Sequence, residues 1–74
     1  MKEKVLITGF NGEIGSKILQ ELVKRGKSVI ALDITDAKEE IASVKYIKDS
    51  ILNFKLISHL FENNNISEVY HFAA

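Results

Sequence analysis

The sequence predicts an α/β fold in which helices cover both faces of a mostly parallel sheet. Residues 5–7 form a continuous apolar run, which is typical of a strand buried on both faces. From Ile14 onward apolar residues recur at helical spacing, and strand and helix patterns then alternate along the sequence. This alternation favours right-handed crossovers and, in a doubly wound sheet, the strand order 3-2-1-4.

The first helix is predicted from one apolar stripe, made of Ile14, Ile18, Leu19, Leu22 and Val23. It is expected to end at Gly26, which suits a left-handed cap after a cluster of basic residues. A second buried strand is predicted for residues 28–32 and ends at Asp33. Residues 34–43 are polar and weakly patterned, which indicates a loop with one short helical turn.

The alternation continues in the second half of the sequence. A short third strand is predicted for residues 44–48, and Asn53 is a suitable N-cap for a second helix. That helix is expected to run to an asparagine turn at residues 63–65. Residues 68–72 form the fourth strand. The prediction is therefore a doubly wound sheet truncated after its fourth strand, with residues 1–74 as the N-terminal half of one domain.

Composition excludes several classes of function. Ten basic and ten acidic residues give the 74-residue chain a net charge of zero, which offers no electrostatic footprint for nucleic acid or an anionic membrane. The chain has no cysteine and only two histidines, so neither a disulfide nor a metal site is expected. No apolar stretch approaches the roughly 18–20 residues of a membrane span. These features favour a cytoplasmic protein.

A glycine motif lies where the first strand meets the first helix. Gly9 is expected to permit a tight exit from the strand, Gly12 a close backbone approach to a pyrophosphate, and Gly15 close packing of the helix. The N–H groups that open the helix favour a bound diphosphate. A tight turn needs one or two glycines for folding alone, so the motif is not decisive by itself. The site predicted in this segment comprises Gly9, Asn11, Gly12, Glu13, Ile14 and Gly15.

Asp33 strengthens the prediction of a dinucleotide site. It follows Gly15 by eighteen residues, at the end of the second strand. A carboxylate there can accept both ribose hydroxyls of an adenosine, and it repels a 2′-phosphate, so it favours NAD over NADP. We assign Asp33 and the adjoining Ile34 to the cofactor site. The alternative for Asp33 is a turn residue that ends its strand.

Four motifs in order resemble the extended short-chain dehydrogenase/reductases, the NAD-dependent epimerase/dehydratase family. They are the glycine turn, Asp33, Asp49 after the third strand, and residues 71–74 after the fourth. The resemblance implies a partial Rossmann domain that binds NAD. It further implies that Asp49 reads the adenine amino group beside the Ser50 backbone. A wall along the adenosine and its phosphates is implied for Phe72, Ala73 and Ala74.

The resemblance implies a parent enzyme that acts on a sugar nucleotide. That chemistry depends on a Tyr-x-x-x-Lys pair, and here Tyr46 and Tyr70 are followed four residues later by Ser50 and Ala74. No catalytic residue is therefore predicted in this chain. Residues 11–15 are also similar to short-chain L-threonine dehydrogenases, because Glu13 replaces the aromatic residue frequent in sugar-nucleotide enzymes.

The fourth strand suggests a second kind of partner besides NAD. In the order 3-2-1-4 it pairs on one side only, and residues 69–72 are apolar without lysine or proline. We expect this edge to pair with a second copy or with a separate remainder of the enzyme. A stand-alone, non-catalytic nucleotide-binding or interaction module is the alternative to an enzyme fragment.

Overall fold

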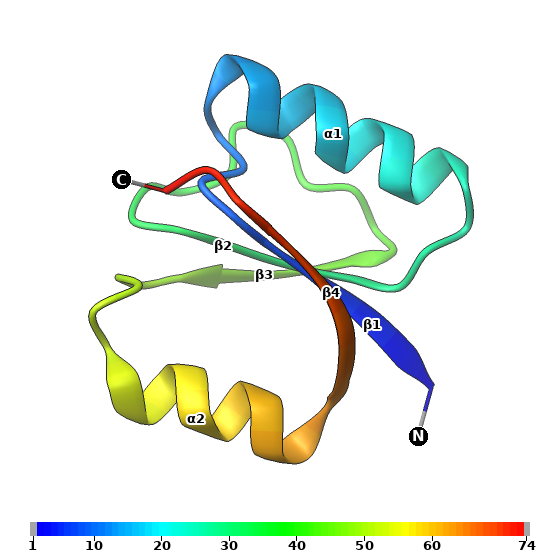
Figure 1. The fold of residues 1–74 in the computed structure, drawn as a ribbon. Coiled ribbons are helices and arrows are strands. Elements are labelled where there is room, and N and C mark those ends of the chain that lie inside the picture. The colour runs from blue at the N-terminus through cyan, green and yellow to red at the C-terminus, as the bar shows by residue number, and fades with distance from the viewer. Residues whose placement is uncertain (1, 74) are drawn as a thin grey trace.

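The computed structural model describes residues 2–73 as one parallel sheet with a helix on each face (Figure 1). The strand order is β3-β2-β1-β4, which confirms the predicted doubly wound arrangement. The elements in chain order are β1 (Glu3–Thr8), α1 (Glu13–Lys24), β2 (Val29–Asp33), β3 (Val44–Lys48), α2 (Phe54–Asn63) and β4 (Asn65–His71).

The two central strands are buried on both faces, as their continuous apolar runs predict. Val5 and Ile7 in β1 belong to the core beneath α1, whereas Leu6 between them belongs to the core beneath α2. Strand β2 alternates in the same way, because Val5 pairs with Val29 and Leu6 with Ile30. Helix α1 contributes Leu19 and Leu22 to the first of these cores, and helix α2 contributes Leu60 to the second.

Helix α1 departs from the predicted apolar stripe at its first turn. Leu19 and Leu22 are buried, but the side chain of Ile14 is 65% exposed and does not belong to the core. In this first turn it is the neighbouring Gly15, not Ile14, that is buried against the turn at Gly9. At the other end, Gly26 has a φ of +76° and forms the expected left-handed cap.

The asparagine run is not a turn between separate elements. Asn63 is the last residue of α2, Asn64 is extended, and Asn65 already begins β4, three residues before the predicted start. The Asn64 side chain makes this short junction possible: its Nδ2 donates to the Leu60 carbonyl and its Oδ1 accepts from Lys4 Nζ. Pairing with β1 thus begins at once, with one register shift between Lys4 and Val5.

Residues 34–43 contain no helix; they end in a single hydrogen-bonded turn, in which the N–H of Val44 donates to the Ile41 carbonyl. The loop is also anchored by side chains: the N–H of Ile41 donates to the hydroxyl of Tyr46, whose ring packs edge-on against Phe10 at a centroid distance of 5.2 Å. Strand β2, Val29–Asp33, begins and ends one residue later than the predicted 28–32.

Residues 2–73 lack two features that would point to other classes of protein. No helix in this part of the chain is long and apolar enough to cross a membrane. These residues also contain no group of three histidine, cysteine, aspartate or glutamate side chains that could hold a metal ion.

Candidate functional site

A pocket of about 560 Å³ lies at the carboxyl ends of the four strands. In a doubly wound sheet, this edge is where ligands bind. The segments that follow β1, β2, β3 and β4 all contribute to it. Its lining residues are Gly9, Gly12, Leu32, Asp33, Ile34, Asp49, Ser50, Ile51, Leu52, Phe72 and Ala73.

The first and third glycines of the motif are required by the fold itself. Gly9 has a φ of +74°, and a Cβ on it would lie 2.6 Å from the backbone nitrogen of Ala73. A Cβ on Gly15 would clash with the carbonyl oxygen of Gly9. Gly9 therefore lets the ends of β1 and β4 approach, and Gly15 lets α1 start directly against the turn.

Gly12 is different, because nothing in the described chain requires a glycine there. Its φ is −71°, and a Cβ would make only an ordinary contact, 3.7 Å from the Gly9 carbonyl oxygen. Gly12 also lines the pocket and is the N-cap of α1, where no side chain caps the helix. By contrast, the Asn53 side chain caps α2 by accepting from the N–H of Leu56. The bare backbone at Gly12 leaves room for a ligand at the start of α1.

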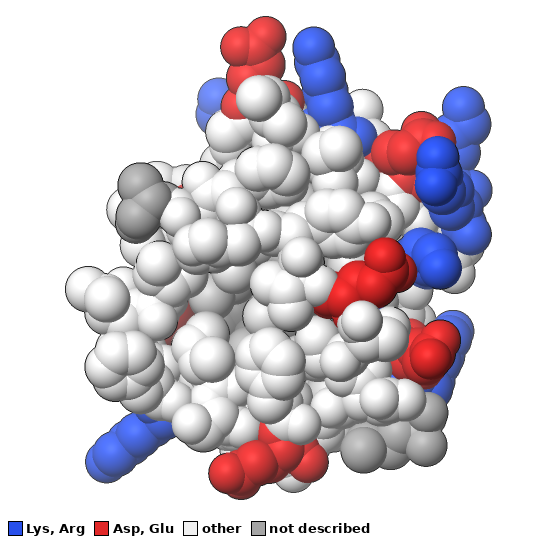
Figure 2. Space-filling view, in the orientation of Figure 1, with Lys and Arg blue, Asp and Glu red and all other residues white. Residues whose placement is uncertain are grey.

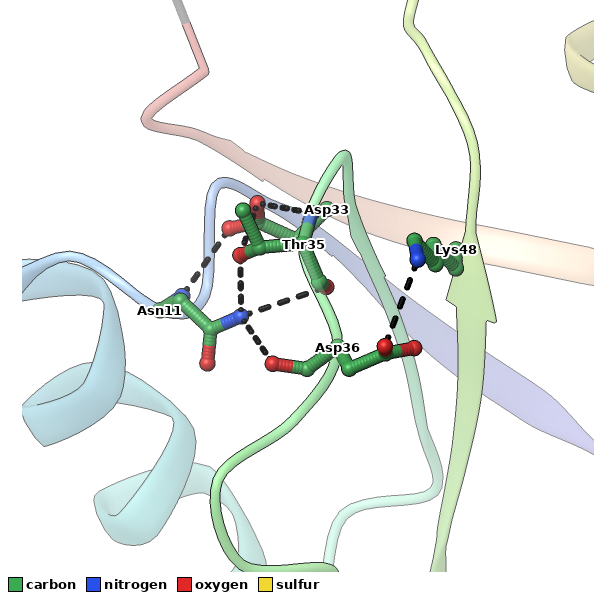
Figure 3. A network of polar contacts seen from close by, with 5 residues as sticks. All are labelled: Asn11, Asp33, Thr35, Asp36 and Lys48. Carbon is green, nitrogen blue, oxygen red and sulfur yellow. Dashed lines mark hydrogen bonds and ion pairs between the residues drawn. The ribbon is translucent and has the colours of Figure 1, made fainter.

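The Asp33 carboxylate is held by donors from two loops (Figure 3). The backbone N–H of Asn11 donates to Oδ2 at 3.0 Å. The N–H and the hydroxyl of Thr35 both donate to Oδ1, each at 3.0 Å. These bonds fix the carboxylate at the end of β2, facing the pocket that it lines.

Opposing effects act on the pKa of Asp33. Burial raises this pKa, but the hydrogen bonds from Asn11, Thr35 and Ile34 together outweigh burial and lower it below its ordinary value of 3.8. The carboxylate is thus ionised at neutral pH, in the form that accepts hydroxyl hydrogens and repels phosphate.

We expect this lowered pKa to appear as an acid-dependent loss of stability. A group whose pKa is lower in the folded chain stabilises the fold above pH 3.8, and this contribution is lost as the pH falls below 3.8 through the lowered value. Thermal unfolding of the protein and of Asp33→Asn, followed from neutral pH into this acid range, measures the effect. The unaltered protein should lose more stability on acidification than the variant does, and parallel curves would contradict the expectation.

Asp49 is oriented in a similar way after β3. Its Oδ1 accepts from the N–H of Ser50 at 2.7 Å, and its Oδ2 accepts from the Asn53 side chain at 3.0 Å. The backbone N–H of Asp49 donates to the Asp33 carbonyl, so the two acidic residues lie on adjacent strand ends. Both line the pocket.

Phe72 and Ala73 form the side of the pocket after β4. The Phe72 N–H donates to the Thr8 carbonyl, and the hydroxyl of the buried Thr8 hydrogen-bonds to Nδ1 of His71 at 2.6 Å. The end of β4 is thereby fixed beside Gly9. Ala74, the last residue of the predicted wall, lies outside the described residues.

Not every predicted site residue lines the pocket. Asn11 directs its side chain into the loop after β2, and Glu13 and Ile14 are exposed on the first turn of α1. Gly15 is buried against Gly9. The structure also adds lining residues that sequence reasoning missed, namely Leu32, Ile51 and Leu52. Of these, Leu52 could have been recognised from the sequence, because it is an apolar residue directly before the Asn53 helix cap.

Neither tyrosine lies in the pocket. The Tyr46 hydroxyl accepts from the N–H of Ile41 in the loop before β3, and the Tyr70 hydroxyl donates to Glu68 within β4. Both therefore make local structural contacts.

The parallel order of the strands and the pocket at their carboxyl ends place the chain among the Rossmann-like α/β folds. Residues 6–74 match the family model described as GDP-mannose 4,6 dehydratase. Because this match covers almost the whole chain, the chain belongs to that family. The resemblance to the epimerase/dehydratase group of the short-chain dehydrogenase/reductases is thereby confirmed.

Curated relatives agree with this family. The chain is 36% identical over 74 residues to a UDP-glucose 4-epimerase of Lactobacillus helveticus, covering 96% of this chain and 22% of the relative. It is 35% identical to short-chain dehydrogenase/reductase family 42E member 1 of Macaca fascicularis, covering 99% of this chain and 19% of that protein. The chain thus spans about a fifth of the length of these relatives.

Solved structures show the same fold. WbmH of Bordetella bronchiseptica, in complex with NAD+, superposes with a TM-score of 0.85 at 32% identity, over 100% of this chain and 26% of the other. A UDP-glucose 4-epimerase of Thermotoga maritima, with UDP-glucose, gives a TM-score of 0.85 at 26% identity, over 96% and 24%.

Proposed function

We propose that this chain supplies the adenosine and pyrophosphate part of an NAD site in a sugar-nucleotide epimerase or dehydratase. The observation that carries the proposal is Gly12, a glycine that lines the pocket although the fold does not require it. The family membership and the NAD complexes of related structures support it.

The residues around the pocket fit a dinucleotide. The uncapped start of α1 at Gly12 suits a pyrophosphate, which can accept from the N–H groups there. Ionised Asp33 suits the ribose diol, and Asp49 with Ser50 suits an adenine edge. Apolar Ile34, with Phe72, completes an environment in which a flat ring can lie.

Bound NAD would supply hydride transfer at its nicotinamide. This chain's residues bind and orient the cofactor, and the Tyr-x-x-x-Lys pair that the resemblance implies for catalysis is absent from its sequence. A sugar nucleotide is the proposed substrate class of the whole enzyme, because the matched relatives include UDP-glucose 4-epimerases. Oxidation of L-threonine stays the alternative, as does a non-catalytic binding module. A cytoplasmic location also stays a prediction.

Substitution of Asp33 tests whether this residue makes the site prefer NAD over NADP. Losing a charge-assisted hydrogen bond costs about 1.5–3 kcal/mol, so Asp33→Ala should weaken NAD binding by about 10- to 150-fold and narrow the preference for NAD over NADP. Calorimetric titration with both dinucleotides measures the effect. Glu40→Ala is the matched control, because it removes one exposed carboxylate from the same loop. Unchanged discrimination in Asp33→Ala would remove Asp33 from the site.

We further propose that the outer edge of β4 pairs with another strand. Strand β4 contacts only β1 among the described strands, which leaves its other side open. The added strand would come from a second copy or from further polypeptide of the enzyme.

A further inference from the structure

Asn11 lies in the glycine turn, but its side chain leaves the pocket and reaches the loop after β2 (Figure 3). Its Nδ2 lies 2.6 Å from Thr35 Oγ1, 2.9 Å from the Asp36 carbonyl oxygen and 3.3 Å from the Thr35 carbonyl oxygen. One amide group therefore joins the turn after β1 to the turn after β2.

The contact with Thr35 fixes the direction of a hydrogen-bond chain. An amide NH₂ can only donate, so Thr35 Oγ1 accepts from Asn11, and the single hydroxyl hydrogen is directed to Asp33 Oδ1. Together with the backbone N–H of Asn11 on Oδ2, these bonds hold both oxygens of the Asp33 carboxylate. Bonds in such a chain polarise one another, and those to the carboxylate are charge-assisted.

The hydrogen bonds from Thr35 and from the Asn11 backbone to Asp33 hold the start of this loop. The bond from Ile41 to the Tyr46 hydroxyl holds its end. The side chain of Asp36 pairs with Lys48 at 3.2 Å, but these side chains are 79% and 59% exposed. Exposed ion pairs contribute little. The Asn11 amide, by contrast, reaches three oxygens of residues 35 and 36 and adds to the bond from its own backbone N–H to Asp33.

We propose that Asn11 is a positioning residue, whose side chain holds the loop after β2 so that the Asp33 carboxylate faces the ribose of a bound dinucleotide. This inference rests on the proposed function and deepens it. Asn11 then acts through Asp33 instead of touching the cofactor with its side chain. Its substitution should therefore weaken binding of the adenosine ribose rather than of the pyrophosphate.

This role predicts a selective effect on cofactor binding. The pyrophosphate is common to NAD and NADP, whereas the Asp33 carboxylate favours the free diol of NAD. Asn11→Ala should therefore weaken NAD binding by about 3- to 10-fold and leave NADP binding no weaker. In the absence of nucleotide, the same variant should raise the pKa of Asp33 toward 3.8, because the donors to its carboxylate lose their support.

The experiment combines titration of both dinucleotides with carbon NMR of the Asp33 side chain as a function of pH. Asn63→Ala is the matched control, since it removes an exposed asparagine amide whose hydrogen bonds among residues 2–73 go to His59 within α2. Thr35→Val and the double variant complete a cycle. If Asn11 acts through the hydroxyl, the double variant should bind NAD more tightly than the product of the two single losses predicts.

The outcomes separate the two proposals. Equal losses for NAD and NADP in Asn11→Ala would place its effect at the pyrophosphate and overturn the positioning role. An unchanged pKa of Asp33 in that variant would overturn it as well. If the unaltered protein binds no NAD, the proposed function and the ribose role both fail, and the pKa measurement still decides whether Asn11 holds Asp33.

Discussion

The Gly12→Val protein is expected to lose NAD binding while it keeps its helices and strands. Two methyl groups at Gly12 would occupy the space at the start of α1 where we place the pyrophosphate. Overpacking of about 1–3 kcal/mol corresponds to a loss of about 5- to 150-fold in affinity. Calorimetric titration with NAD and ADP measures binding, and circular dichroism measures the fold.

Gly15→Ala gives the opposite pattern and is the matched control within the same motif. Its added Cβ would clash with the Gly9 carbonyl oxygen, so we expect a loss of thermal stability before any specific loss of binding. Gly12→Ala, with one methyl group, should fold normally and bind NAD less well than the unaltered protein. Equal NAD affinities for the unaltered protein and Gly12→Val would refute the assignment of the motif.

The central part of the fold is predictable from the sequence because its residues have only one way to be buried. The run at residues 5–7 needs cover on both faces, and the structure provides it through α1 and α2. The loop ends of β1 and β2 are predictable to within one residue for a similar reason, since Gly9 and Asp33 follow apolar runs. Parallel topology then brings these ends together at one pocket.

Where prediction was wrong, tertiary contacts overrode local preference. Asparagine is depleted in strands, so the early start of β4 at Asn65 follows from pairing with Glu3 rather than from propensity. Ile14 matches the helical stripe but is exposed, because in that turn the contact with the end of β1 is made by Gly15.

In the site as well, the sequence predicts which residues take part better than it predicts what each side chain does. Asn11 was predicted from its place in the motif, but only the structure shows that its side chain holds the loop after β2. Leu52 was missed because its contribution arises where the turn after β3 meets the ends of the other strands. Its place directly before the Asn53 cap was the one local sign of a role in the site.

The open side of β4 leads to the other large expected effect, which is self-association of the chain. The two edges of the sheet differ: β3 is five residues long and carries Lys45 and Lys48, whereas β4 is seven residues long without lysine or proline. Charged and short edges resist pairing with further strands, so β4 is the vulnerable edge. In the view of Figure 2, in which β4 lies toward the viewer, most of the surface is uncharged.

Several exposed apolar side chains lie on β4 or close to it in the chain. Val69 is 49% exposed and Phe72 is 42% exposed, and Phe61 on the neighbouring helix is 46% exposed. A net charge of zero provides no repulsion between copies. A chain of this size buries only about 60% of its unfolded surface, so covering such side chains has a large effect on its marginal stability. Pairing through β4 therefore has both a backbone template and an apolar driving force.

We expect sedimentation velocity to show dimers or larger species whose proportion rises with concentration. Val69→Lys should shift the distribution toward a folded monomer, because a lysine beside the edge opposes the addition of another strand. Phe54→Lys is the matched control, since Phe54 is 74% exposed on α2 and lies off the edge. If the control dissociates the species and Val69→Lys does not, the helix face and not β4 drives association. A folded monomer that persists into the hundreds of micromolar would exclude self-pairing and leave further polypeptide as the proposed partner of this edge.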